Sequence, residues 1–177
     1  MKNEQMEGRL KTEVLEFIQS RKSLQLSTIT ASGQPYASYA PFAIGDDCLL
    51  VLLSDIAVHA ENLRCHPQAS VLIIEDEDSA QELFARVRLN YSVSSEYIPL
   101  SDDRWQQDID TLAARHGDRI RNLSELEDFK LFRLTPGGGR YVKGFGRAFA
   151  LKGETLAGDI VDPMRDGHKK REVAEAG

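Results

Sequence analysis

One histidine in this chain stands where no hydrophobic core requires it: His168, which follows Gly167 in a polar C-terminal stretch. Glycine lets the backbone approach a ligand closely, and a neutral imidazole is a common metal ligand. Lys169, Lys170 and Arg171 come next, and such cations pair with carboxylates. A solvated tail histidine is the simpler interpretation. The chemical alternative is an axial bond to the iron of a porphyrin whose two propionates the cations hold.

The other three histidines lie where helices are expected to begin or end. His116 stands beside a glycine at a helix C-terminus, where an imidazole compensates the helix dipole. His66 precedes the proline that closes another helix, and we interpret both as structural. His59 lies within a turn of a helix start, one position before the apolar stripe. It is placed to line a pocket between helix and sheet, although a structural role is the simpler interpretation there too.

The chain lacks the sequence patterns of common hydrolases and nucleotide-binding enzymes. It has no Gly-x-Ser-x-Gly elbow, Walker loop, Cys-x-x-Cys pair or His-Glu-x-x-His helix. The glycines at 137–139 fall in an expected hairpin loop, without the strand-then-helix context of a phosphate-binding loop. Cys48 and Cys65 are unrelated in spacing, and we interpret them as reduced, partly buried thiols.

Charge and hydropathy exclude two classes of partner. Lys and Arg number 22 against 28 Asp and Glu, a net charge of -6, and residues 75–78 form an acidic run, so a nucleic acid is disfavoured. No apolar stretch approaches the roughly 20 residues of a membrane-spanning helix. The first nine residues carry no apolar segment typical of a secretory signal. We therefore expect a soluble, cytoplasmic protein.

The hydrophobic periodicity predicts one domain, residues 1–161, and a polar tail, residues 162–177. Apolar residues recur at helical spacing over residues 5–20, and from Ser23 the period changes to strand alternation. Successive hairpins without crossover helices favour an antiparallel barrel, a mainly β fold with flanking helices (α+β). The expected elements are helices at 5–20, 54–64 and 102–116, strands at 23–29, 35–44, 48–53, 70–75, 83–94, 129–134 and 140–151, and a helical turn started by a Ser79–Glu82 capping box.

Six sequence blocks, in this order, resemble one known family. They are RKSLQLST at 21–28, SYAPF at 38–42, SDIAVHAENL at 54–63, LFARVRL at 83–89, DFKLFRL at 128–134 and VKGFG at 142–146. The chain resembles the HugZ/HutZ haem-utilisation family, a branch of the pyridoxamine phosphate oxidase-like split barrels. The resemblance implies a six- to eight-stranded antiparallel split β-barrel that forms a homodimer, with haem held where the two barrels meet.

The resemblance also implies roles for individual residues. Gly167-His168 matches the family's tail motif, so His168 is the expected iron ligand, and Lys169 is expected beside it. Asp128 matches a carboxylate of the other subunit that bonds the ligand's second ring nitrogen, which makes it the candidate catalytic residue. His59 keeps a family position. Two departures are that residues 147–166 match poorly and that Val58 and Glu61 replace expected basic residues.

The expected function is oxidative opening of haem to a biliverdin-type tetrapyrrole with release of iron. Haem is then both cofactor and substrate, and an electron donor and a haem-delivery protein are the expected partners. Arg86 and Arg88, two positions apart on an expected strand, share a face and are candidates for holding the propionates. Two alternatives stay open: a flavin-binding oxidoreductase with FMN at the dimer interface, and a haem carrier without turnover.

Overall fold

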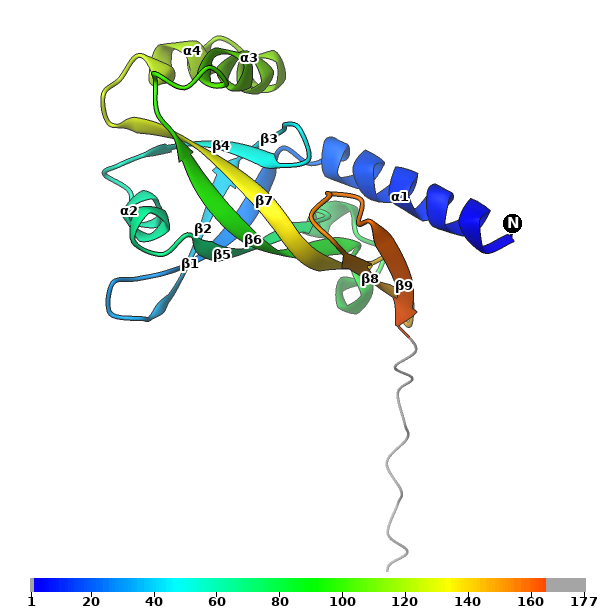
Figure 1. The fold of residues 1–177 in the computed structure, drawn as a ribbon. Helices are drawn as coiled ribbons and strands as arrows, with labels where there is room; N and C mark the ends of the chain where they lie inside the picture. Colours follow the sequence, from blue (N-terminus) through cyan, green and yellow to red (C-terminus); the bar gives the residue numbers. More distant parts are fainter. Residues whose placement is uncertain (1, 165–177) are drawn as a thin grey trace, which may run out of the picture.

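The structure, a computed structural model, describes residues 2–164, with side chains from residue 5 onward. Helices and strands follow one another along a single sheet (Figure 1). The elements are α1 (Lys2–Ser20), β1 (Ser23–Ile29), β2 (Pro35–Pro41), β3 (Ala43–Ile44), β4 (Leu49–Ser54), α2 (Val58–Cys65), β5 (Gln68–Ile74), η1 (Glu77–Ser79), η2 (Leu83–Ala85), β6 (Arg88–Ile98), α3 (Trp105–His116), α4 (Arg119–Ser124), β7 (Phe129–Val142), β8 (Ala148–Lys152) and β9 (Ile160–Met164).

The strands form one antiparallel sheet in the order β2-β1-β5-β6-β7-β4-β3, which curls into a half-barrel. The long strand β7 pairs with β4 through its first half and with β8 through its second half. β8 in turn pairs with β9. The expected mainly β, antiparallel fold with flanking helices is confirmed. The sheet has nine strands: the segment predicted as one strand, residues 35–44, forms β2 and β3, and β9 was not predicted.

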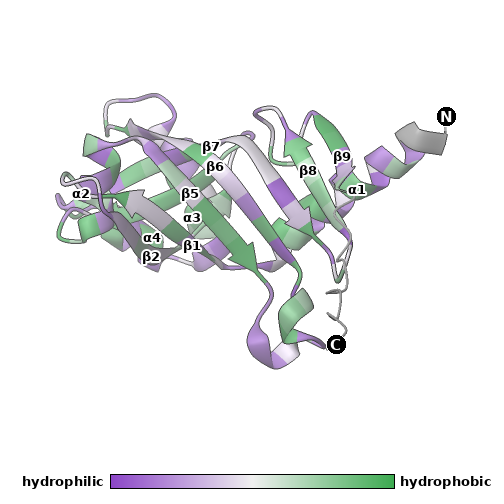
Figure 2. Ribbon diagram, turned by 90° about the horizontal axis from the view of Figure 1, so that it is seen from below, coloured by the Kyte–Doolittle hydropathy of each residue, from purple (hydrophilic) through white to green (hydrophobic). Residues whose placement is uncertain are grey.

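Strand alternation fills the inside of the curl. In β1 every second residue, Leu24, Leu26 and Thr28, is buried, while the residues between them are exposed. Polar and apolar segments alternate in the same way along the strands in Figure 2. Val14 and Ile18 of α1 complete this core, as the helical spacing predicted. The Tyr91 hydroxyl donates to the Leu156 carbonyl within it.

A second apolar layer covers the outer side of β4. Leu50 and Leu131 face outward from the barrel and pack against Ile109 and Leu112 of α3. Because the barrel core covers one face of β4 and the helices cover the other, the strand is apolar on both faces, as predicted for residues 48–53. The helix α4, which contributes Ile120, was not predicted.

The glycine run at 137–139 is the clearest error of the sequence analysis. We expected a hairpin loop there, whereas β7 continues through it. A Cβ on Gly139 would lie 2.5 Å from the Asn90 carbonyl oxygen and 2.6 Å from the Tyr91 ring. Glycine therefore allows β6 and β7 to approach closely, beside a register shift between Tyr91 and Val93.

Two element starts also differ from the prediction. α2 begins at Val58 instead of residue 54: the Ser54 hydroxyl accepts from the Ile56 N–H and donates to Asp128 in the turn that precedes the helix. β6 begins at Arg88 because residues 83–85 form a 3₁₀ turn, capped when the Phe84 N–H donates to the Glu82 carboxylate over 3.0 Å. The capping box of Ser79 with Glu82 is thus wrong.

The C-terminal strand crosses the boundary that we expected between domain and tail. β9 pairs with β8 from Ile160 to Met164, three residues beyond residue 161. The remaining tail, residues 165–177, lies outside the described residues. No helix of the described chain is long and apolar enough to cross a bilayer.

The two cysteines differ in accessibility. Cys48 is buried and burial raises the pKa of its thiol to about 11, whereas Cys65 is exposed at the end of α2. We expect one thiol per chain to react with Ellman's reagent in the native protein and the second only after unfolding, because the thiolate is the reactive form. The Cys65→Ser variant should show no native reaction. Two equally fast thiols would contradict this assignment.

Candidate functional site

A basic pocket lies where the second half of β7 meets β6 and β8. Its volume is about 440 Å³, and Met164, the last described residue, forms part of its wall. Three arginines line it, each from a different segment: Arg88 from β6, Arg140 from β7 and Arg147 from the turn before β8. The pairing of β6 with β7 and of β7 with β8 brings these segments together.

None of the three arginines forms a close ion pair within the described residues, although the charge of Arg147 helps to lower the pKa of Glu13. Arg88 donates to the Arg86 carbonyl over 3.0 Å, and Arg147 donates to the Lys143 carbonyl over 3.4 Å. Within the same part of the chain, ion pairs neutralise other arginines such as Arg104 and Arg133. Positive charge that no carboxylate neutralises favours an anion, and guanidinium groups bind carboxylate or phosphate through two parallel bonds.

Two phenylalanines flank the arginines. Phe84 is 89% exposed and Phe145 is 70% exposed, unusual values for such large apolar side chains. Phe145 stands at the tip of a tight turn, closed where the Arg147 N–H donates to the Gly144 carbonyl over 3.2 Å. Gly144 and Gly146 have φ angles of +146° and +70°, which favour glycine. Arginines beside exposed aromatic rings suit a ligand that is both apolar and anionic.

Arg86 does not join this pocket. We expected it on a strand face with Arg88, but it precedes β6. Its guanidinium donates to the Glu75 carbonyl and lies 3.4 Å from the Glu77 carboxylate. The shared strand face is therefore wrong, because the 3₁₀ turn at 83–85 ends just before Arg86.

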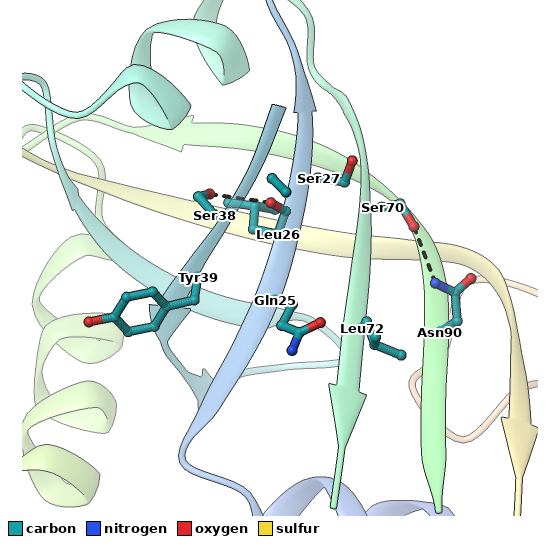
Figure 3. A pocket seen from close by; sticks show the side chains of 9 residues that line it. Gln25, Leu26, Ser27, Ser38, Tyr39, Ser70, Leu72 and Asn90 are labelled. Carbon is teal, nitrogen blue, oxygen red and sulfur yellow. Dashed lines mark hydrogen bonds between the residues drawn. The ribbon is translucent and has the colours of Figure 1, made fainter. Parts of the chain in front are cut away.

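The basic pocket continues into the outer face of the sheet. The strand register aligns Tyr39, Gln25, Leu72, Asn90 and Arg140 in one row across β2, β1, β5, β6 and β7. Figure 3 shows the first four of these around a hollow of about 470 Å³. Small polar side chains such as Ser27 and Ser70 line the rest of the hollow. No described helix covers this face.

His59 of α2 contacts β2. Its Nδ1 lies 2.9 Å from the Ser38 hydroxyl, which also lies 3.2 Å from the Leu26 carbonyl oxygen. Burial lowers the pKa of the half-buried imidazole, so it is neutral near neutral pH.

Asp128 lies at the other end of β7 from the basic pocket. It directly precedes Phe129, the first residue of the strand, and its carboxylate accepts from Ser54 over 2.6 Å. Arg140 follows Phe129 by eleven positions along the strand, which corresponds to roughly 35 Å. One chain therefore does not bring Asp128 and the arginines to the same small ligand. His168 and Lys169 lie outside the described residues.

The remaining histidines behave as structural residues. His116 ends α3, and its Nε2 lies 2.7 Å from the Phe42 carbonyl oxygen, tying the helix end to the sheet. His66 is the C-cap residue of α2. No group of three or more His, Cys, Asp or Glu side chains suited to a metal ion occurs in the part of the chain that the structure describes.

The sequence analysis missed Arg140, Arg147, Phe84 and Phe145. Phe84 and Phe145 lay within blocks that we had noticed, LFARVRL and VKGFG, but without a role. Arg140 had been placed at the start of a new strand after a loop. Only the register of β7 with its neighbours shows that these residues surround one pocket.

Comparisons with known proteins agree with this fold. The sequence model of the pyridoxamine 5'-phosphate oxidase family matches residues 10–143. The chain is 45% identical over 170 residues to a Vibrio cholerae protein named haem oxygenase HutZ, covering 96% of each chain.

Two crystal structures are also similar. One is HutZ from Vibrio cholerae, described as a haem storage protein, with a TM-score of 0.69, 46% identity and coverage of 72% of this chain and 89% of that chain. The other is Campylobacter jejuni ChuZ, with a TM-score of 0.76, 29% identity and coverage of 92% of this chain and 68% of that chain. The resemblance noted in the sequence is confirmed.

Proposed function

The chain belongs to the pyridoxamine 5'-phosphate oxidase family, and from that premise we propose that it binds haem between two copies and opens the ring oxidatively. The relative named haem oxygenase HutZ supports haem as the ligand. The observation that carries the proposal is the basic pocket: three arginines that form no close ion pair within the described part of the chain, flanked by two exposed phenylalanines. Haem has the matching chemistry, two propionates on a flat apolar ring.

The chain length would let His168 reach this pocket. Met164 lines the pocket, and His168 follows it by four positions. A fully extended chain of four residues spans about 14 Å at most. In the proposal, His168 supplies the axial bond to iron, Lys169 and the arginines hold the propionates, and the phenylalanines contact the ring.

The proposed second copy explains why Asp128 lies far from the arginines. In the proposed homodimer, Asp128 of one copy faces His168 of the other and accepts a hydrogen bond from its ring N–H. This bond fixes the orientation of the imidazole and raises its basicity. The open sheet face around Gln25 and Asn90 is the proposed contact surface. Sedimentation equilibrium that found only single chains at micromolar concentration would contradict this arrangement.

Iron chemistry supplies the activation of dioxygen, with electrons from a reductase or a small reductant. The chain's own contribution is orientation: the arginines fix the ring edge, His168 fixes the metal, and Asp128 fixes the imidazole. Ring opening would consume dioxygen and electrons from the donor, and would give a biliverdin-type tetrapyrrole, carbon monoxide or a related one-carbon product, and free iron. A haem-delivery protein remains a proposed partner.

FMN is the alternative ligand, since the basic pocket also suits a phosphate. The first turn of α2 fits a phosphate poorly, because Glu61 stands there and Arg64 lies 3.5 Å from Asp55. We therefore rank haem first. Purified protein with a flavin spectrum, and no Soret band on adding hemin, would reverse this order.

A hemin titration tests the proposal directly. Wild-type protein should give a sharp Soret band that saturates, and His168→Ala should lose it because the axial ligand is removed. His66→Ala removes a different half-buried histidine and should behave as wild type. With ascorbate and catalase present, the Soret band should disappear while bilin and iron are released. A stable Soret band under these conditions would identify a haem carrier without turnover.

A further inference from the structure

We infer that Ser54 is a positioning residue for Asp128: its hydroxyl holds one carboxylate oxygen and leaves the other directed to an imidazole of the second copy. This inference rests on the proposed function, in which Asp128 acts on His168 of that copy. It concerns a residue to which neither the sequence analysis nor the relatives' names assign a role.

The backbone fixes Ser54 and Asp128 beside each other. β4 and β7 pair so that Ser54 lies opposite Phe129, the residue after Asp128. The Asp55 N–H donates to the Asp128 carbonyl over 2.7 Å and extends this pairing by one residue. The carboxylate therefore starts from a backbone position that the sheet defines, and only its side-chain torsions remain to be set.

The Ser54 hydroxyl has a defined direction. Its oxygen accepts from the Ile56 N–H over 3.2 Å, and its single proton goes to Oδ2 of Asp128 over 2.6 Å. A bond of this length to a carboxylate is charge-assisted and strong. The chain of bonds from Ile56 through Ser54 to Asp128 thus fixes Oδ2 as the carboxylate oxygen that faces Ser54.

The nearby cations pair with Asp55 and leave Asp128 able to accept a hydrogen bond from a group outside the chain. Arg64 and Lys130 lie 3.5 Å and 3.8 Å from Oδ2 of the neighbouring Asp55. Among the described residues, Asp128 has no ion pair, and its Oδ1 accepts no hydrogen bond. Oδ1 of Asp55 also lacks a partner among the described residues, but it is buried, so Asp128 is the carboxylate whose second oxygen can accept from an imidazole outside the chain.

Exposed apolar side chains occur in the two chain segments that the Ser54–Asp128 bond joins. Ile56 is 87% exposed, Leu126 48% and Val58 43%. A second copy or a bound ring covering them would exclude water from the carboxylate. Exclusion of water strengthens a hydrogen bond between a carboxylate and an imidazole. The setting thus favours a bond that forms only in the assembled, haem-loaded protein.

The test compares Ser54→Thr with Ser54→Val in the haem-loaded, full-length protein. The two side chains have the same shape and both suit a strand end, so only the hydroxyl differs. We expect Thr to keep the wild-type rate of haem degradation and Val to slow it roughly three- to tenfold, the loss expected for one ordinary intramolecular hydrogen bond. The iron–histidine stretching frequency of ferrous protein should shift in Val only.

Asp128→Asn and Ser124→Ala complete the design. Asp128→Asn should keep the Soret band and shift the same vibration, whereas Ser124→Ala, which removes a hydroxyl bonded to the Arg121 carbonyl, should change neither quantity. If Asp128→Asn shifts the vibration but Ser54→Val matches Ser54→Thr, the inference about Ser54 is wrong and the proposed function stands. If Asp128→Asn leaves the vibration and the rate unchanged, Asp128 has no role. The inference about Ser54 and the proposed bond between Asp128 and His168 are then both wrong.

Discussion

Replacing Asp108 with Ala is expected to lower the free energy of unfolding by about 3–5 kcal/mol, because it leaves a largely buried guanidinium without its partner. Asp108 is 2% exposed, and its two carboxylate oxygens accept from Arg133 over 2.7 and 2.8 Å. The hydrogen bonds that Arg133 donates to Asp108 raise the pKa of Arg133. The guanidinium therefore stays charged and cannot avoid the cost of an unpaired buried charge by losing its proton. Urea unfolding of the two proteins at one pH measures the difference.

Asp110 provides a matched control two residues along the same helix. Its side chain is 48% exposed and pairs with Arg121, which is equally exposed. Exposed pairs contribute about 0–1 kcal/mol, so Asp110→Ala should change stability little. The double variant Asp108→Leu/Arg133→Met should recover most of the loss, since an apolar pair suits the surrounding layer. Equal losses of unfolding free energy in Asp108→Ala and Asp110→Ala would show that burial of the Asp108–Arg133 pair does not set the size of the loss.

Reversing charge in the basic pocket should abolish tight binding of hemin. The double variant Arg140→Glu/Arg147→Glu removes two guanidinium groups and places carboxylates against the propionates. Each charge-assisted bond contributes about 1.5–3 kcal/mol, so we expect the hemin Kd to rise by about 100-fold or more. Spectrophotometric titration at fixed ionic strength measures the Kd, and thermal unfolding checks that the fold is retained.

The control for this variant carries the same change in net charge elsewhere. Lys22 and Arg119 are exposed on other elements, and Lys22→Glu/Arg119→Glu alters the overall charge equally. If the control weakens hemin binding as much as the pocket variant, the effect arises from net charge and the basic pocket is not the propionate site. A wild-type Kd in the pocket variant would also exclude it.

Local sequence signals predicted most of the fold. Alternation in β1 and helical spacing in α1 depend on one face being buried, and both were read correctly from residues such as Leu24, Leu26 and Ile18. The glycines at 137–139 were misread because glycine also permits close strand packing. Whether Gly139 forms a turn or touches Tyr91 depends on a residue almost 50 positions away, which no local pattern contains.

The candidate site depended still more on distant pairing. Arg88, Arg140 and Arg147 come together only through the register of three strands. The Ser54–Asp128 bond likewise joins two loops 74 residues apart. Asp128 itself entered through resemblance to a family and not through any local signal. The sequence therefore indicated which residues can do chemistry, while the sheet decides which of them meet.

The helices α3 and α4 also limit how the protein can assemble. Within the described residues they cover the outer side of β4 and the start of β7, and they leave open the row from Tyr39 in β2 to Arg140 in the second half of β7. A two-fold contact through that surface would use the same patch on both molecules. In the proposed pair each copy would cover this patch of the other, so the contact would close on itself and would not continue into a filament.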